Sequence, residues 1–397
     1  PKPTRANGLQ GYPESNDQVK EVADKVWGPC DGKNVTENRY GKGRIIWGPM
    51  LCEILGGDGI GPDFTCGSES DQASLDYIHR RTDDADIYFV SNTTDQDMRV
   101  NATFRVKGRV PELWDPATGE IKPLHVFTTT DDGILLSLEL TPHDSFFVVF
   151  RDKSRPIPLS SAFYILKQDE DILEFKALNV LEWDGEKAKV EISWPGEYFL
   201  ITEDYRSSKK QIDTVDDPIT INGPWQVRFD EKLGGPGSVT MNELAPWNES
   251  DDDSVKYYSG QADYRCEFEL DEKLLADEYR LKLDLGELWA IGEVKLNGKP
   301  LGTLWKPPYT VDITGAAKAG KNVIEVRVAN TWSNRLVGDA LLPKEQRITK
   351  TNVTSMNGKP WKHVPLLRSG LFGPVQVLPV KVIDIELQPI LKAGEAD

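Results

Sequence analysis

The stretch from residue 294 to residue 374 constrains the fold of this chain more than any other part. It begins with two short extended runs around Asn297-Gly298, a pair typical of tight hairpins because both residues tolerate a positive φ angle. Within residues 321–329, apolar and charged side chains alternate, which predicts a strand with one buried face. The stretch therefore predicts paired strands, and with them a β-rich domain.

The composition is that of a soluble globular protein. The chain has 397 residues, of which 28% are charged and 39% hydrophobic. This length predicts about two to four domains with substantial cores. The net charge of −17 argues against nucleic acid or an anionic membrane as a partner, because phosphates would be repelled. A neutral ligand such as a glycan suits this charge, and no run approaches the ~20 apolar residues of a membrane helix.

The N-terminal part, residues 1–84, is predicted to be a partial α/β domain. Residues 15–27 place their apolar side chains on one helical face, and residues 44–47 predict a short buried strand. Residues 71–80 are predicted to form a second helix or a loop. One helix and one strand make an incomplete sheet, so we expect the missing strands to precede Pro1.

Three β-rich parts are expected to follow. Residues 85–152 contain strand-like runs separated by turns at short intervals, which predicts a small β-sandwich domain. Residues 153–222 are predicted to be a β-rich connecting region. Residues 223–395 are predicted to form the main β-sandwich, which includes the opening stretch.

No cofactor and no metal site are expected from the motifs. The four cysteines show no CxxC pair and no Cys/His spacing of a zinc site, and free buried thiols are favoured over one disulfide. Residues 251–253 are three consecutive acids, and carboxylates bind Ca²⁺. Consecutive acids cannot all face one ion, so a solvated loop is favoured, with structural calcium left open.

Three motifs carry a resemblance to known families. They are LNGKPLG at 296–302, NTWSNRLVGD at 330–339 and SGLFGP at 369–374. Together they resemble the sugar-binding β-sandwich of family 2 glycoside hydrolases, and still more the C-terminal region of family 106, the α-L-rhamnosidases. The resemblance implies a mainly β protein, in which a partial α/β unit and a small β domain precede a C-terminal jelly-roll (galactose-binding-like) β-sandwich. It also implies a periplasmic or extracellular location.

The loop after the strand at 321–329 holds most of the candidate substrate-binding residues. Amide, carboxylate and guanidinium groups bind adjacent sugar hydroxyls, and an indole ring stacks on the CH face of a sugar. By resemblance, the candidates are Asn330, Trp332, Asn334, Arg335 and Asp339, with Trp305 as a weaker one. The alternative is an internal polar network that pins the loop to the sandwich, with Trp332 in the core. If the loop binds sugar, substitution of Asp339 or Arg335 weakens activity and leaves folding intact.

No catalytic residue is expected within this chain. Most glycosidases use two carboxylates about 5–10 Å apart, and barrel enzymes hold them at the ends of parallel strands. The sequence shows no βα repeat that would supply such strands, and none of its four histidines lies in a metalloprotease or esterase motif. In family 106 the pair lies on a barrel upstream of the part that this chain resembles.

The sequence therefore predicts an accessory part of an α-L-rhamnosidase-like glycoside hydrolase. Its partners would be a carbohydrate and the N-terminal catalytic barrel, with neither nucleic acid nor membrane. The whole enzyme would hydrolyse rhamnosyl linkages of polysaccharides. The alternative function is a stand-alone, non-catalytic carbohydrate-binding protein.

Overall fold

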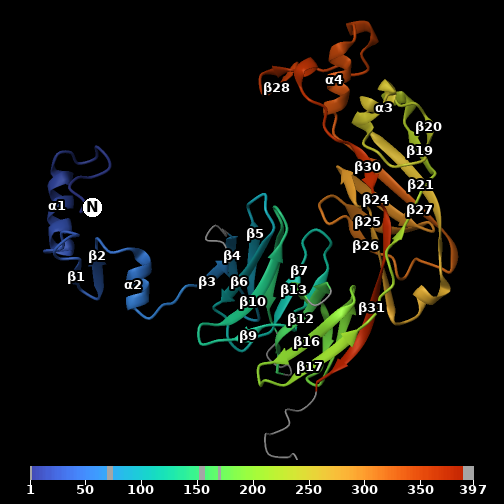
Figure 1. Ribbon diagram of the computed structural model, residues 1–397. Coiled ribbons are helices and arrows are strands. Elements are labelled where there is room, and N and C mark those ends of the chain that lie inside the picture. Colours follow the sequence, from blue (N-terminus) through green and yellow to red (C-terminus); the bar gives the residue numbers. More distant parts are fainter. Residues whose placement is uncertain (1, 69–74, 152–156, 169–170, 388–397) are drawn as a thin grey trace, which may run out of the picture. The chain divides into compact units, whose positions relative to one another are not determined.

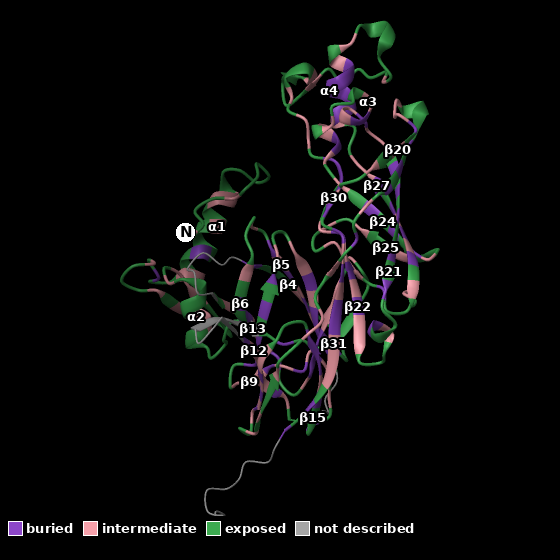
Figure 2. Ribbon diagram, turned by 45° about the vertical axis from the view of Figure 1, so that its right-hand side comes forward, coloured by how far each residue is buried: buried purple, intermediate pink, exposed green. Residues whose placement is uncertain are grey.

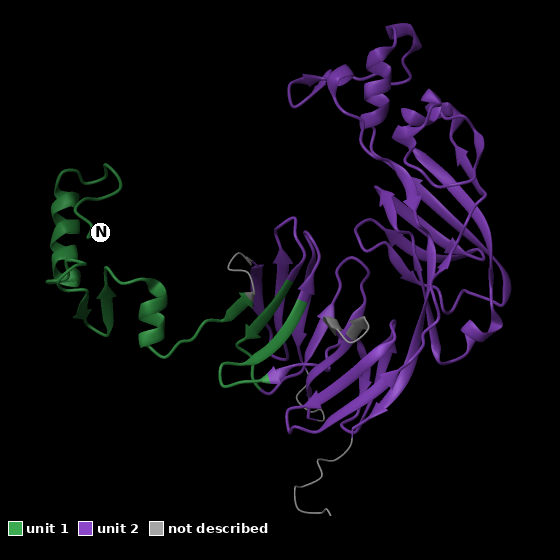
Figure 3. Cartoon of the chain, in the orientation of Figure 1, with its two compact units in different colours: residues 1–73, 99–107, 129–138 green, residues 74–98, 108–128, 139–397 purple. Residues whose placement is uncertain are grey.

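The computed structural model describes residues 2–68, 75–151, 157–168 and 171–387. The chain divides into two compact units (Figure 3), the first made of residues 1–73, 99–107 and 129–138, the second of the remaining residues. Among the described residues, no helix is both long enough and apolar enough to cross a membrane.

The first unit begins with two helices and a hairpin. Helix α1 confirms the helix predicted at 15–27, and the elements are α1 (Glu14–Trp27), β1 (Glu37–Tyr40), β2 (Gly43–Ile46) and α2 (Leu51–Gly57). Strand β2 falls where a short buried strand was predicted, but its residues are exposed or half-buried. Among the described residues its sheet contains only β1 and β2, so no further strand flanks β2 and the prediction of burial is wrong.

Most of a four-stranded sheet also belongs to the first unit. Its order is β3-β6-β10-β9, with bounds Phe64–Ser68, Met98–Phe104, Ile134–Leu140 and Thr128–Thr129. Strand β6 buries Val100, Ala102 and Phe104, so alternate residues form the apolar face.

A five-stranded sheet in the second unit overturns one prediction. Its order is β4-β5-β11-β7-β8, with bounds Leu75–Arg81, Asp86–Asn92, Ser145–Phe150, Pro111–Trp114 and Ile121–Pro123. Residues 71–74 lie outside the described residues, but β4 is a strand, so the helix or loop predicted at 71–80 is wrong there. Strand β4 pairs residue for residue with β5, and this pairing outweighs its weak local signal. Both β3 and β4 precede residue 85, where the small β domain was expected to begin.

Residues 157–212 form more than a connection. Four strands make a sheet of order β13-β12-β16-β17, with bounds Asp171–Ala177, Leu159–Gln168, Gly196–Thr202 and Ser207–Ile212. Its residues Ala162 and Leu200 share a hydrophobic core with Val190 and Ile192 of another sheet. This part therefore contributes to a hydrophobic core, which also includes Ile385 and Leu387.

The terminal sandwich consists of two sheets. The first has the order β20-β19-β21-β27-β24-β25, with bounds Ser238–Met241, Trp225–Phe229, Gln261–Leu270, Gly320–Ala329, Ile291–Leu296 and Lys299–Leu304. The second has the order β14-β15-β31-β22-β26, with bounds Val180–Trp183, Lys187–Ile192, Gln376–Glu386, Tyr279–Asp284 and Thr310–Asp312. Tyr264, Leu283 and Val326 from both sheets share one core, so the sheets pack face to face. The predicted mainly β fold with a terminal sandwich is confirmed.

One long strand, β31, belongs to both cores of the second unit (Figures 1 and 2). It pairs with β22 through Gln376–Lys381 and with β15 through Lys381–Glu386. Val377 lies in the core of the terminal sandwich, whereas Ile385 lies in the core around β12 and β16. One strand of the terminal sandwich therefore contributes side chains to both cores.

The predicted hairpin is confirmed between β24 and β25. Asn297 has φ 53° and Gly298 has φ 79°, and these residues join two strands that pair in antiparallel register. Positive φ at both positions is the geometry of a type I′ turn, whose twist matches that of the strands.

A buried carboxylate joins β15 to β22 across β31. Glu191 lies 2.7 Å from Lys282 Nζ and 3.5 Å from an Arg280 nitrogen, and it accepts a hydrogen bond from Asn179. Burial alone would raise the pKa of Glu191, but the hydrogen bond and charge of Lys282, with Asn179, outweigh burial and lower it.

We expect Glu191→Gln to lower the free energy of unfolding by about 1–3 kcal/mol at pH 7. A carboxylate with a lowered folded-state pKa stabilises the fold above its unfolded-state pKa, and the contribution is lost as pH falls through the folded value. The variant should therefore show a flatter stability profile below about pH 4.5 than the parent chain. Denaturant titration across this range measures it; parallel profiles for the two chains would contradict the assignment.

Candidate functional site

The candidate residues gather where three strands of the terminal sandwich end. Strand β24 begins at Ile291, which pairs with Ala329, the last residue of β27, and the next residue Gly292 pairs with Leu304, the last residue of β25. Helix α4 (Ser333–Leu341) follows β27 at the same end. The predicted loop at 330–339 is thus mostly a short helix.

Asn330 fastens this end of the sheet to the neighbouring loop. Its side-chain oxygen accepts from the Gly260 amide at 2.9 Å, and its amide nitrogen donates to the Tyr258 carbonyl at 2.9 Å. Its backbone N–H donates to the Gly260 carbonyl as well. Both side-chain atoms therefore bond within the protein.

Asn334 joins the first turn of α4 to the segment before β30 (Gly370–Gly373). Its amide nitrogen donates to the Leu367 carbonyl at 2.7 Å and to the Ser369 hydroxyl at 3.2 Å, and its oxygen accepts from the Leu367 amide at 2.8 Å. Asn334 is 1% exposed, so its hydrogen-bonding capacity is used inside the protein.

Arg335 and Asp339 form a buried ion pair on α4. Nε of Arg335 lies 3.0 Å from a carboxylate oxygen of Asp339, with side-chain exposures of 8% and 4%. The carboxylate also accepts from the backbone amides of Ile348 and Thr349 and from the Thr349 hydroxyl. Burial alone would raise the pKa of Asp339, but the Thr349 hydrogen bonds and the Arg335 charge outweigh burial and lower it.

The tryptophans at this end are exposed, in contrast to the polar candidates. Trp332 is 72% exposed and Trp305 is 54% exposed. The alternative that Trp332 lies in the core is therefore wrong, because its indole ring stands outside the first turn of α4. Trp305 directly follows Leu304, at the end of β25. The geometry thus assigns the four polar candidates to an internal network and leaves the two aromatic candidates available to a ligand.

A third tryptophan, Trp289, was not among the sequence candidates. It ends strand β23 (Glu287–Trp289), two residues before Ile291, and it is 43% exposed beside Ile291, also 43% exposed. Trp289, Trp305 and Trp332 therefore flank the same end of the sheet, and we call them the aromatic edge. In the sequence, the apolar pair Leu288-Trp289 follows the polar turn at Gly286-Glu287, which is a pattern that could have pointed to Trp289. Buried aromatic residues show the same pattern, so it does not predict exposure.

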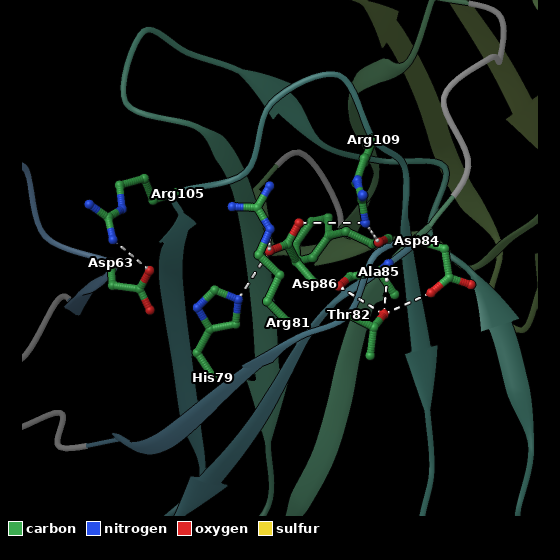
Figure 4. A network of polar contacts seen from close by, with 10 residues as sticks. Asp63, His79, Arg81, Thr82, Asp84, Ala85, Asp86, Arg105 and Arg109 are labelled. Carbon is green, nitrogen blue, oxygen red and sulfur yellow. Dashed lines mark hydrogen bonds and ion pairs between the residues drawn. The ribbon is translucent and has the colours of Figure 1, made fainter.

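A separate polar cluster lies at the β4–β5 turn (Figure 4). The carboxylate of Asp86, 5% exposed, lies 3.2 Å from His79 Nε2, 3.5 Å from Arg81 Nε and 3.6 Å from an Arg109 nitrogen. Arg109 also donates to the Phe150 carbonyl. These groups satisfy one another, so the cluster stabilises the turn between the two strands.

One of the three acids considered for calcium caps a helix. Asp252 caps helix α3 (Asp253–Lys256) by accepting from the Ser254 amide and hydroxyl, and these bonds lower its pKa. Among the described residues, no group of three or more His, Cys, Asp or Glu side chains could hold a metal ion. The four cysteines are free thiols; Cys30 and Cys266 are buried and Cys52 is exposed.

Comparison with known proteins confirms both resemblances. Residues 1–129 match the family 106 glycoside hydrolase model, described as alpha-L-rhamnosidase. Residues 244–357 match the model of the glycosyl hydrolase 2 galactose-binding domain-like family. The second match contains the aromatic edge and α4.

Individual relatives cover nearly the whole chain. A putative beta-glucuronidase of Formosa agariphila is 24% identical over an alignment that covers 95% of this chain and 48% of that protein. The solved structure of a rhamnosidase from Novosphingobium sp. PP1Y is 29% identical, with a TM-score of 0.67, and covers 91% of this chain and 28% of that one. The structure of a Ruminococcus gnavus beta-glucuronidase is 22% identical and covers only 30% of this chain and 23% of that one, with a TM-score of 0.26. The chain spans about half the length of the curated relative.

Proposed function

We propose that this chain is the C-terminal accessory part of an α-L-rhamnosidase-type glycoside hydrolase. Its terminal sandwich presents the aromatic edge to a sugar of the substrate, while carboxylates on a catalytic barrel elsewhere in the polypeptide cleave a rhamnosyl linkage. The enzyme needs no cofactor in this proposal. It acts in the periplasm or outside the cell, where polysaccharides are degraded.

The contrast between the polar and aromatic candidates carries this proposal. Asn330, Asn334 and Asp339 hold the sheet end and α4 rigidly through internal hydrogen bonds, and the exposed tryptophans stand on this frame. A rigid indole face suits the CH face of a sugar, because little conformational entropy is lost on binding. The likeness to a solved rhamnosidase over 91% of the chain supports the class of enzyme.

The strand pairing of this chain supports the proposal that the catalytic carboxylates lie elsewhere in the polypeptide. The ladders of the terminal sandwich are antiparallel, as in β21 with β27 and in β22 with β31. Barrel glycosidases place their acids at the ends of parallel strands, each followed by a helix. The described residues contain no such repeat of alternating strands and helices.

Hydrolysis of an aryl α-L-rhamnoside tests the proposal. We expect the 397-residue chain to fold and show no turnover, whereas a polypeptide extended upstream to the length of the relatives hydrolyses the substrate. In that enzyme, Trp332→Ala or Trp305→Ala should raise KM for a rhamno-oligosaccharide about two- to tenfold, since an aromatic contact contributes about 0.5–1.5 kcal/mol.

Trp194→Ala is the matched control, because Trp194 is also exposed (49%) but lies outside the terminal sandwich's strand ends. Its KM should stay at the parental value. Turnover by the 397-residue chain alone would refute the accessory role, and unchanged KM in the Trp332 and Trp305 variants would remove the aromatic edge from the substrate site.

A further inference from the structure

The segment that follows α4 has a charge opposite to that of the chain. Residues 341–370, here called the basic lobe, contain six Lys and Arg against one Glu, a formal net charge of +5, whereas the whole chain carries −17. The lobe includes the short elements η4 (Lys344–Gln346), β28 (Ser355–Met356), β29 (Lys359–Pro360) and η5 (Trp361–His363) (Figure 1). All six cationic side chains are exposed: Lys344, Arg347, Lys350, Lys359, Lys362 and Arg368.

Five of these six cations lack an acidic partner, and Arg347 Nε donates instead to the Leu342 carbonyl at 3.0 Å. In the part of the chain that the structure describes, no carboxylate lies within ion-pair distance of the five: Lys344, Arg347, Lys350, Lys359 and Lys362. Elsewhere in the same sandwich, cations pair with acids, as in Arg327 with Asp263 at 2.6 Å. An acidic protein that leaves five cations of one 30-residue segment without acid partners concentrates positive potential at that segment.

The lobe is held in a defined conformation. Asp339 accepts hydrogen bonds from the backbone at Ile348 and Thr349, near its start. Trp361 Nε1 donates to the Val353 carbonyl across the β28–β29 hairpin, and Asn334 binds the backbone of Leu367 near its end. Because these bonds fix the backbone, the cations project from a preorganised surface, which lowers the entropy cost of binding.

The lobe also lies next to the aromatic edge. Asn334, two residues after Trp332, bonds to Leu367, the residue before Arg368. Arg368 pairs with Glu287, at the start of the strand that ends in Trp289. Residues close in the chain to Trp332 and Trp289 therefore contact the lobe, and Figure 2 shows buried α4 beside these exposed loops.

We propose that the basic lobe binds the anionic groups of an acidic polysaccharide, that is, carboxylate or sulfate groups on sugars next to those that contact the aromatic edge. This inference rests on the proposed function, because it takes a sugar polymer as the ligand. It adds the chemical class of that polymer. Lysine ammonium groups bind such anions as point charges, and tryptophans bind the apolar faces of sugars. The strongly acidic remainder of the chain repels other parts of an anionic polymer and so confines it to the lobe.

Binding of three polymers to the 397-residue chain, measured by isothermal titration calorimetry, tests the proposal. The probes are polygalacturonate oligomers for carboxylates, dextran sulfate for sulfates, and dextran as the neutral control. We expect one or both anionic polymers to bind, dextran to bind at least tenfold more weakly, and the anionic binding to weaken as NaCl rises from about 0.05 to 0.3 M. The carboxylate and sulfate arms identify which group the lobe prefers.

A quadruple variant with matched control isolates the lobe. Replacement of Lys344, Lys350, Lys359 and Lys362 by Gln should weaken anionic binding about tenfold or more, since these are the cations free to meet the ligand. The control replaces four exposed lysines outside the lobe by Gln and should bind like the parent chain: Lys20, Lys42, Lys210 and Lys232. Circular dichroism and the thermal midpoint establish that both variants fold.

Several outcomes would overturn the proposal. The first is an equal loss of anionic-polymer binding in the quadruple variant and its control. The second is equal affinity of the chain for dextran and for the anionic polymers. The third is tighter binding to duplex DNA or to phosphatidylserine vesicles than to either anionic glycan. The aryl rhamnoside used to test the proposed function is neutral. Absence of anionic-polymer binding by the parent chain, together with hydrolysis of the aryl rhamnoside by the extended enzyme, would therefore refute the lobe's role and leave the proposed function standing.

Discussion

Asp339→Ala is expected to lower the free energy of unfolding of the terminal sandwich by about 3–5 kcal/mol, because it leaves the buried Arg335 charge without its partner. Both side chains of this pair are less than a tenth exposed, so water cannot replace the lost carboxylate. The backbone amides of Ile348 and Thr349 lose their acceptor at the same time. Urea titration followed by tryptophan fluorescence measures the change.

An exposed ion pair provides the matched control. Asp384 pairs with Lys187 at 3.2 Å, and both side chains are 45% exposed, so Asp384→Ala should cost at most about 1 kcal/mol. Asp339→Asn should lie between the two, since an amide oxygen still accepts one hydrogen bond but carries no charge. A loss in Asp339→Ala as small as that of the control would mean that the pair does not stabilise the fold.

This expectation reverses what the sequence alone implied for Asp339 and Arg335. A polar residue in a loop after a strand has the same appearance in sequence whether its partners are a ligand or distant backbone atoms. The partners of Asn330 lie 70 and 72 residues earlier in the chain, at Gly260 and Tyr258. Such long-range hydrogen bonds leave no local pattern, so the internal network could be stated only as an alternative.

Local patterns did predict much of the terminal sandwich. The Asn297-Gly298 turn and the alternation along β27 depend on φ preferences and on a period of two, which neighbouring residues determine. By contrast, β31 joins two cores, and β4 forms by pairing with β5. Both depend on which strands meet in space, and propensity is a weak guide to that.

Exposure of the aromatic residues was the other property that the sequence left open. Trp225 and Trp247 are 1% exposed, whereas Trp332 is 72% exposed, although all three stand beside polar residues in the sequence. The distinction arises from position in the sandwich: Trp225 and Trp247 belong to its core, whereas Trp332 lies past the end of β27. The same distinction gives the next expected result.

Trp247→Ala is expected to cost about 3–5 kcal/mol of unfolding free energy, the range for removal of a large aromatic side chain from a core. Trp247 packs against the rings of Phe229 and Tyr258, with ring centroids 5.3 and 5.6 Å apart, and its indole N–H donates to the Tyr264 hydroxyl. Gly370 leaves room for it, since a Cβ there would lie 2.5 Å from the indole nitrogen. Urea titration measures the loss.

Trp332→Ala removes the same side chain from the surface and is the control for the core substitution. Because Trp332 contacts no other aromatic ring in the described part of the sandwich and is 72% exposed, its replacement should change the free energy of unfolding by no more than about 0.5 kcal/mol. The two variants should therefore separate stability from recognition: Trp247→Ala unfolds at lower urea, and Trp332→Ala weakens oligosaccharide binding at unchanged stability. Equal destabilisation by both would contradict the exposed position of Trp332 and, with it, the aromatic edge as a surface for sugar.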